Sequence, residues 1–267
     1  RFLGTALQKY LREAPLDLVE LILDRALHAL DPTDDSPVII RGDTDGRSAA
    51  DMHVNGINTA RGSLAEALGD LLIFDSDGQR TALITPYLGS LVSDPVLTVR
   101  ACVAHTLSAS LRYARTEVLT AFAVLIQADD RLLATEPVER LMVYIGNVDP
   151  EAIDPIIQRM LASENTEVRE AGGTIAAFAA LEWDRPGFMQ QALSGDFHVR
   201  KGIAKLTAEL FVKTSNNELA TETLIHLMND DVDEVRKETA EVASRLRHHS
   251  LRPFDRLLMA LIDSSSY

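Results

Sequence analysis

The residues that could do chemistry are few and scattered along this 267-residue chain. Its single cysteine, Cys102, follows Val99 by three residues in an apolar segment, so we interpret it as a packed core residue and not as a nucleophile. The sequence contains no Walker A loop, no Rossmann glycine fingerprint, no HExxH pair and no GxSxG elbow. We therefore expect a protein that is not an enzyme and that has no cofactor and no metal.

Two Asp-x-Asp-Gly strings, at residues 43–46 and 75–78, suggest calcium binding. An EF-hand-like loop that reads each string as positions 3 to 6 needs oxygen ligands at positions 1 and 12. These positions hold Arg41 and Met52 for the first string, and Ile73 and Ile84 for the second. The calcium geometry fails, and Asp-Gly turn chemistry accounts for both strings. Calcium stays the alternative, mainly at the first string because its surroundings are acidic.

Basic and imidazole side chains gather near the end of the sequence. His248 and His249 are adjacent, but neighbours on a helix point in different directions, so they form a poor chelate. We interpret the basic residues as the cationic end of a helix, stabilised by the helix dipole and by nearby acids. Contact with an anion or a phosphate is the alternative. The cluster consists of Arg245, Arg247, Arg252 and Arg256.

Helices must position these residues, since the core is rich in Leu and Ala, which are strong helix formers, and only 5% of residues are aromatic. Apolar spacing predicts an N-terminal helical pair within residues 1–30. Residues 31–53 form an acidic segment with Pro and Gly, which predicts a functional or partly disordered loop. Residues 54–267 carry a repeated pattern. We expect the three parts to form one continuous domain.

The repeated unit is a helix A, a short polar turn and a helix B. Five of the six B helices open with a β-branched or small residue followed by Arg, Glu139 replaces this Arg in the other, and the unit starts lie 39, 39, 30, 31 and 36 residues apart. Small residues inside the B helices would let another helix approach closely. The A helices are expected over 82–92, 117–127, 151–161, 187–193 and 218–228. The B helices open at Ala60-Arg61, Val99-Arg100, Val138-Glu139, Val168-Arg169, Val199-Arg200 and Val235-Arg236.

This pattern resembles the HEAT repeat family over about three-quarters of the chain. The residues that carry the resemblance are Asp94-x4-Val99-Arg100-x3-Ala104, Glu164-x3-Val168-Arg169, Asp196-x2-Val199-Arg200-x3-Ala204 and Asp231-x3-Val235-Arg236-x3-Ala240. The resemblance implies an all-α fold, a right-handed α-solenoid of HEAT-like helical hairpins with A helices on the convex side and B helices on the concave side. The third unit departs from the pattern, because Glu139 stands where Arg is expected.

A narrower likeness concerns residues 55–68, 94–107 and 128–141. These segments look like the helical-repeat regions of large bacterial nucleotide-binding proteins, some of which act as sensors in defence against phage. The chain also begins with Arg1 inside a helical pattern. The likeness implies that the chain is part of a longer bacterial protein, whose other domains could be its partners.

Two rows of residues on the B helices are candidate sites. The arginines that open the helices could form a binding stripe, but the HEAT resemblance favours structural pairing with acids of the turns. The solvent side of the B helices is the better candidate for recognition. The structural row is Arg61, Arg100, Arg169, Arg200 and Arg236. The recognition residues are Glu66, His105, Tyr144, Thr174, Phe178, Lys205 and Glu241.

Charge and composition exclude several functions. The net charge of −14 opposes binding to nucleic acid, the uncharged runs are too short to span a membrane, and the absence of a signal peptide indicates a cytoplasmic location. We predict a non-enzymatic scaffold, sensor or regulatory module that binds a protein or peptide on its concave face. The alternative is a HEAT-like nucleic-acid-binding enzyme of the DNA glycosylase type, which would need a basic concave surface. A scaffolding lyase or ligase subunit has no residue signature here.

Overall fold

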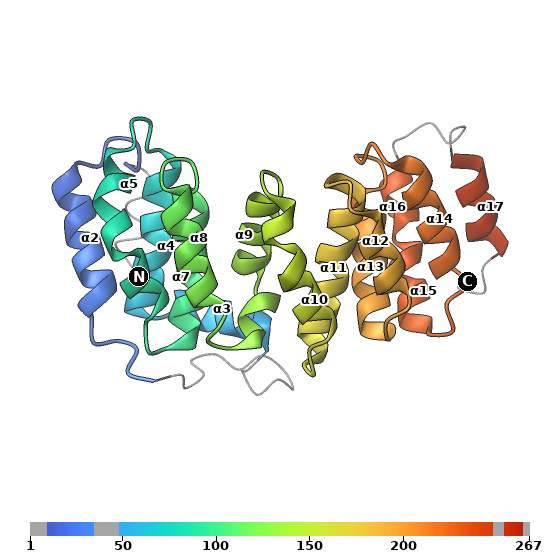
Figure 1. The fold of residues 1–267 in the computed structure, drawn as a ribbon, viewed down its shortest axis with the longest axis horizontal. Helices are drawn as coiled ribbons and strands as arrows, with labels where there is room; N and C mark the ends of the chain where they lie inside the picture. The colour runs from blue at the N-terminus through green and yellow to red at the C-terminus, as the bar shows by residue number, and fades with distance from the viewer. Residues whose placement is uncertain (1–9, 35–47, 248–253, 264–267) are drawn as a thin grey trace. The chain divides into compact units, whose positions relative to one another are not determined.

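The computed structural model describes residues 10–34, 48–247 and 254–263, and every regular element in these ranges is a helix (Figure 1). The predicted all-α class is confirmed for this part of the chain. The chain divides into two compact units, Arg1–Tyr144 and Ile145–Tyr267. The first calcium-like string, the His248-His249 pair, Arg252 and most of the first predicted helix lie outside the described residues.

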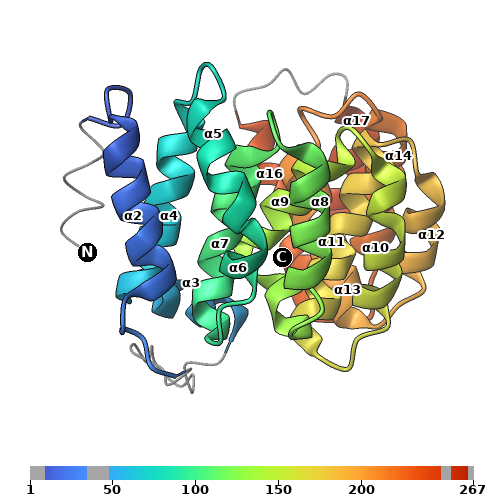
Figure 2. The same ribbon diagram turned by 60° about the vertical axis from the view of Figure 1, so that its left-hand side comes forward.

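The first unit is built from helices that pack in chain order. Helix α2 packs on α4 and α5 (Figure 2), α4 packs on α7, and both α6 and α7 pack on α8. The elements are α2 (Leu16–His28), α3 (Ala49–Ile57), α4 (Ala60–Ile73), α5 (Gln79–Ile84), η1 (Thr85–Tyr87), α6 (Leu88–Val92), α7 (Leu97–Ser110), α8 (Arg115–Leu125), η2 (Asp130–Ala134) and α9 (Glu136–Gly146).

The first A helix of this unit is broken in the middle. Sequence periodicity predicts one helix over 82–92, but the structure has α5, a 3-10 turn and α6 in its place. Pro86 lies in the 3-10 turn, and proline cannot donate the backbone hydrogen bond that a continuous α-helix requires. The three short elements form a bent arm that packs on α2 and α7.

Helix α3 lies where the sequence analysis places the end of the acidic loop, residues 31–53. It begins at Ala49 because Ser48 caps it: the Ser48 hydroxyl accepts a hydrogen bond from the Asp51 amide at 3.1 Å and donates to the Asp51 carboxylate at 2.9 Å. Figure 1 shows α3 running crosswise to α4 and α7, both of which it contacts. It therefore does not belong to the A and B pattern.

The second unit repeats the hairpin arrangement. Helices α10, α12 and α13 pack on α11, α13 packs on α14 and α15, and α14 packs on α17. The expected B helix that opens at Val235-Arg236 is interrupted at Glu241 and forms two short helices. The elements are η3 (Pro150–Ala152), α10 (Asp154–Leu161), α11 (Thr166–Glu182), α12 (Pro186–Leu193), α13 (Phe197–Leu210), α14 (Asn217–Leu227), α15 (Asp233–Ala240), α16 (Val242–Leu246) and α17 (Asp255–Asp263).

Glycines let the two central B helices of the second unit, α11 and α13, lie against each other. A Cβ on Gly173 would lie 2.1 Å from the Val199 carbonyl oxygen, and a Cβ on Gly202 would lie 2.0 Å from that of Glu170. No side chain fits at such distances, so both positions need glycine. The expectation that small residues permit close approach of the B helices is confirmed here.

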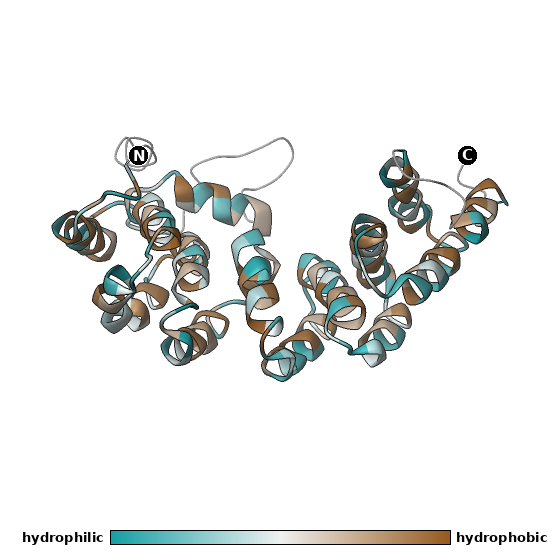
Figure 3. Ribbon diagram, turned by 90° about the horizontal axis from the view of Figure 1, so that it is seen from above, coloured by the Kyte–Doolittle hydropathy of each residue, from teal (hydrophilic) through white to brown (hydrophobic). Residues whose placement is uncertain are grey.

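Figure 3 shows that the helices carry both hydrophobic and hydrophilic residues. The buried face is mainly Leu, Ala, Val and Ile, as in Leu68, Leu107, Leu141, Ala176 and Leu224. No helix in the described ranges combines the length and the apolar composition needed to cross a bilayer.

Candidate functional site

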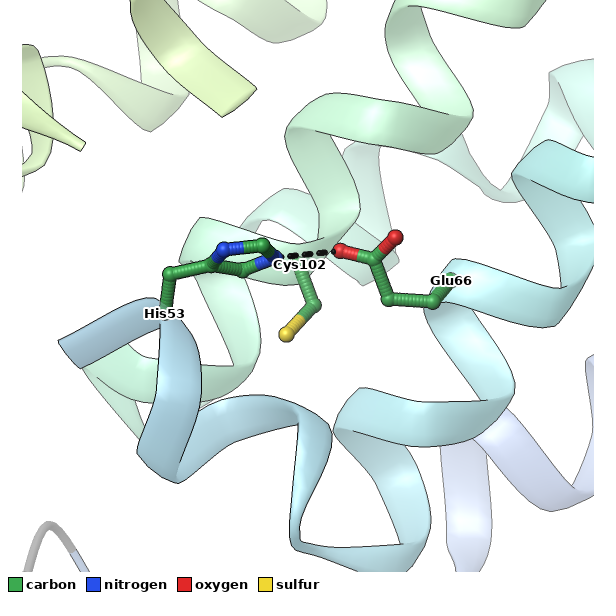
Figure 4. A group of neighbouring side chains, drawn as sticks. All are labelled: His53, Glu66 and Cys102. Atoms are coloured by element: carbon green, nitrogen blue, oxygen red, sulfur yellow. Dashed lines mark hydrogen bonds and ion pairs between the residues drawn. The ribbon is translucent and has the colours of Figure 1, made fainter. Parts of the chain in front are cut away.

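Titratable side chains from three helices of the first unit meet where α3 crosses α4 and α7. His53 comes from α3, Glu66 from α4 and Cys102 from α7 (Figure 4). The Nε2 atom of His53 lies 2.8 Å from the Oε1 atom of Glu66. One ligand atom from each of the three residues lies within 4.8 Å of the other two. His53 and Glu66 are half-buried and Cys102 is fully buried.

A close helix crossing creates this arrangement. A Cβ on Gly56 would lie 2.1 Å from the Thr98 carbonyl oxygen and 2.6 Å from the Cys102 sulfur, so glycine alone lets α3 rest on α7. His53 lies three residues before Gly56 on the same helix, and residues at that spacing share a face. The crossing therefore directs His53 toward α4 and α7. Thr59 starts α4 just after this point, because its hydroxyl accepts a hydrogen bond from the Gly62 amide at 3.1 Å.

Burial controls the electrostatics of the cysteine. Desolvation raises the pKa of the Cys102 thiol well above its usual value, and the negative charge of Glu66 adds to the effect. The free thiol is thus protonated at neutral pH and is a poor nucleophile. This agrees with our interpretation of Cys102 as a packed residue. Its neighbours in the cluster, however, are polar: the imidazole of His53 and the carboxylate of Glu66.

A second polar pair lies farther along the same two helices. The Nε2 atom of His105 on α7 lies 3.1 Å from the Oδ1 atom of Asp70 on α4. Burial alone would lower the pKa of His105, but the hydrogen bond to Asp70 and the charges of Glu66 and Asp70 outweigh it and raise the pKa. Gly69 makes room for the imidazole, since a Cβ there would lie 2.2 Å from the ring.

The structure brings only part of the predicted recognition row together. Glu66 and His105 both lie in this polar region, where each is held by a neighbouring side chain. Tyr144, in the same unit, is 46% exposed. Glu66 and His105 therefore pair with other side chains of the same chain, His53 and Asp70. Sequence spacing alone does not predict these contacts.

The remaining recognition residues belong to the second unit. Thr174 donates a hydrogen bond to the Glu170 carbonyl at 3.2 Å, and Phe178 packs edge-on against Trp183 with ring centroids 5.3 Å apart. Both side chains are half-buried, whereas Lys205 and Glu241 are exposed. Phe178 therefore packs within this unit and offers only part of its ring for contact with a partner.

The arginines that open the B helices pair mostly with acids of the next turn. Arg61 bonds both carboxylate oxygens of Asp94, at 2.7 and 3.1 Å, with both side chains buried. Arg61 also donates to the Ala29 carbonyl at 2.8 Å, which ties it to the end of α2. Arg100 instead donates to the backbone carbonyl of Asp94 in its own turn.

Two of the three row arginines in the second unit follow the same rule. Arg169 bonds Asp196 at 2.7 Å, and Arg200 bonds Asp230 at 2.6 Å and Asp231 at 2.8 Å. Arg236 pairs with Asp233 at the start of its own helix at 3.2 Å. These contacts tie turns to helices, so the row acts as a structural ladder.

An open recess lies beside α2 on the A-helix side of the first unit. The recess has a volume of about 520 Å³. Its apolar lining consists of Leu23 and Leu27 of α2 and of Leu83, Pro86 and Tyr87 of the bent arm. The polar residues at this recess are Glu20, Asp24 and His28. Leu27, His28 and Tyr87 also line an adjoining hollow of about 310 Å³. The recess thus offers apolar contacts beside acidic groups.

Two other sequence candidates have structural explanations. In the second Asp-x-Asp-Gly string, Asp75 accepts hydrogen bonds from the Thr81 hydroxyl and amide and from the Gly78 amide. These bonds lower its pKa despite the opposing effect of burial, so the carboxylate stabilises a turn. In the C-terminal basic cluster, Arg256 pairs with Glu218 at 2.7 Å.

No family model, no curated protein and no solved structure matches this chain. Its candidate sites therefore rest on their own geometry. Sequence reasoning missed His53, because it placed this residue in the acidic loop. The available signal was Ser48-x-x-Asp51 as a helix cap, which would have put His53 and Gly56 on one helix.

Proposed function

We propose that this chain is a non-enzymatic interaction module that binds a protein or peptide segment. The observation that carries the proposal is the recess between α2 and the bent arm, where Leu27, Leu83 and Tyr87 form apolar walls beside Glu20 and Asp24. Tyr87 is 45% exposed, so its ring is accessible to a bound segment. Apolar anchors with adjacent charges are typical of sites that accept an amphipathic helix.

The charge of the recess indicates the type of segment that fits. Glu20 and Asp24 are exposed acids one turn apart on α2, and the whole chain carries a net charge of −14. A segment with leucine-type anchors and flanking Lys or Arg complements both features, whereas an acidic segment is repelled. The same charge opposes the phosphates of a nucleic acid, which weighs against the glycosylase-type alternative.

The wider architecture belongs to the same proposal. Helical hairpins in phase and the Arg–Asp ladder support a HEAT-like right-handed α-solenoid, in which the predicted recognition row would lie on the concave face. The resemblance of residues 55–68 to bacterial sensor proteins supports a scaffold or sensor role within a longer bacterial protein, in the cytoplasm. Partners would then include other domains of that protein.

A pair of synthetic amphipathic peptides tests the proposal. Both carry leucine anchors on one face, and one has Lys and the other Glu at the flanking positions. We expect the Lys peptide to bind, as measured by fluorescence anisotropy at near-physiological salt, and the Glu peptide to bind at least about tenfold more weakly. Tyr87→Ala should weaken binding by about 1–2 kcal/mol because it removes a central aromatic contact.

Matched variants locate the binding surface. Tyr144→Ala removes an equally exposed tyrosine on α9 and should leave binding at the recess unchanged. Loss of binding in Tyr144→Ala but not in Tyr87→Ala would move the site to the concave row. Tight, salt-sensitive binding of duplex DNA, with neither peptide bound, would contradict the proposal and favour the enzyme alternative.

A further inference from the structure

We propose that His53, Glu66 and Cys102 form a binding site for a divalent transition-metal ion of the zinc type. This site lies at the crossing of α3 with α4 and α7, apart from the recess beside α2. The inference is independent of peptide binding, because it rests on different residues and a different ligand.

The spacing of the three side chains is close to that of a metal site. A tetrahedral zinc ion has bonds of about 2.3 Å to sulfur and about 2.0–2.2 Å to nitrogen and oxygen, which keeps its ligand atoms roughly 3.3–3.6 Å apart. The three ligand atoms already lie within 4.8 Å of one another. His53 and Glu66, now hydrogen-bonded at 2.8 Å, need to separate slightly to bind one ion.

The ligand types select the class of ion. One thiolate, one imidazole and one carboxylate suit zinc and its neighbours in the first transition row, while calcium and magnesium prefer oxygen ligands alone. Binding replaces the Cys102 S–H bond by a sulfur–metal bond and releases one proton to solvent. Three protein ligands leave a fourth position for water or for a side chain of a bound partner.

The polar character of the crossing is what distinguishes this group from ordinary packing. An isolated buried cysteine packs well among apolar side chains. Cys102, however, lies under a half-buried imidazole and a half-buried carboxylate, both of which lose hydration on folding. Gly56 keeps α3 close enough for His53 to reach these two residues. A metal ion would compensate the desolvated groups and fasten α3 to both neighbouring helices.

Cobalt titration of the full chain tests the site. The protein is kept reduced and free of any affinity tag, and Co²⁺ is added while the thiolate-to-cobalt charge-transfer absorption is recorded. Because Cys102 is the only cysteine, this band reports on it alone. We expect saturation at one ion per chain, displacement by Zn²⁺, and at least about tenfold weaker binding in His53→Gln and in Glu66→Gln, since even outer-sphere changes typically cost 10–100-fold.

His105→Gln is the matched control, because it alters a half-buried imidazole on α7 that pairs with Asp70 and is not a proposed ligand. It should retain the band and the affinity. Circular dichroism checks that each variant keeps its helices, and X-ray absorption of the wild-type zinc complex gives the ligand types without any variant. Absence of the thiolate band, a shell without sulfur, or unchanged affinity in both ligand variants would overturn the proposal.

Discussion

At the residue scale, the ion pair of Arg61 with Asp94 is buried on both sides, with side chains only 9% and 8% exposed. Asp94 also accepts a hydrogen bond from the Val96 amide at 2.8 Å, so it orders the turn before the next helix as well. The Arg61 backbone amide in turn bonds the Asp31 carbonyl at 3.1 Å. One arginine therefore joins the end of α2, the start of α4 and the turn before α7.

We expect Arg61→Ala to destabilise the first unit by about 3–5 kcal/mol, because it leaves the Asp94 carboxylate buried without its partner. Chemical denaturation followed by circular dichroism measures this change. Arg140→Ala is the control: Arg140 pairs with Glu136 on one exposed helix face, where such pairs contribute about 0.3–0.5 kcal/mol. Equal losses in the two variants would show that burial of the Arg61 pair is energetically unimportant.

The arginine pairing could be anticipated from the sequence, because Arg follows the opening residue of five of the six B helices and an acid recurs three to five residues before that residue in several turns. The cluster at His53 could not. Its members come from helices separated by 13 and 36 residues along the chain, and they meet only because Gly56 permits one crossing. Contacts made by such crossings depend on three-dimensional packing that helical periodicity does not encode.

At the scale of elements, most helices follow from apolar spacing, and the differences have local causes. Pro86 breaks the A helix over 82–92, and Ser48 starts α3 inside the expected loop. Both signals are single residues whose effect overrides the surrounding pattern. Close helix contacts through glycine are the other local determinant, since they leave no room for a Cβ at Gly173 or Gly202.

Gly173→Ala tests the contact between α11 and α13. Alanine is the better helix former by about 1 kcal/mol, but here its Cβ would overlap the Val199 carbonyl, and we expect a net loss of about 1–3 kcal/mol. Thermal unfolding of the second unit measures the effect. Gly187→Ala in α12 is the control, because a Cβ there has open space within 4 Å. It should be neutral or slightly stabilising; a loss equal to that of Gly173→Ala would contradict the packing argument.

At the scale of the whole molecule, the fold stabilises the charged form of several of its acidic residues. Hydrogen bonds from nearby donors lower the pKa values of Asp75, Asp129, Asp196 and Asp230. For Asp75, Asp196 and Asp230 burial is the largest single influence and acts in the opposite direction, but donors such as Thr81 and Arg200 outweigh it. The division into two units was not anticipated, since the repeat pattern continues through residue 144.

These shifts determine how stability depends on pH. A carboxylate whose pKa is lower in the folded state stabilises the fold above its unfolded pKa of about 3.9, and this contribution is lost as pH falls through the folded value. We expect the free energy of unfolding to be steady near neutral pH and to fall below about pH 4. Asp230→Asn should reduce stability at pH 7 and flatten the acid dependence. An unchanged acid profile in this variant would show that Asp230 is not among the groups responsible.

The direction of the Arg–Asp pairs also bears on how such a chain can change its length during evolution. Arg169 bonds Asp196 of the following turn, and Arg200 bonds Asp230 of the turn after that. The hairpin of α12 and α13 thus supplies an acid to the hairpin before it and an arginine to the hairpin after it. A duplicated hairpin carries both halves of this junction, so it restores the pairing on each side without any further substitution.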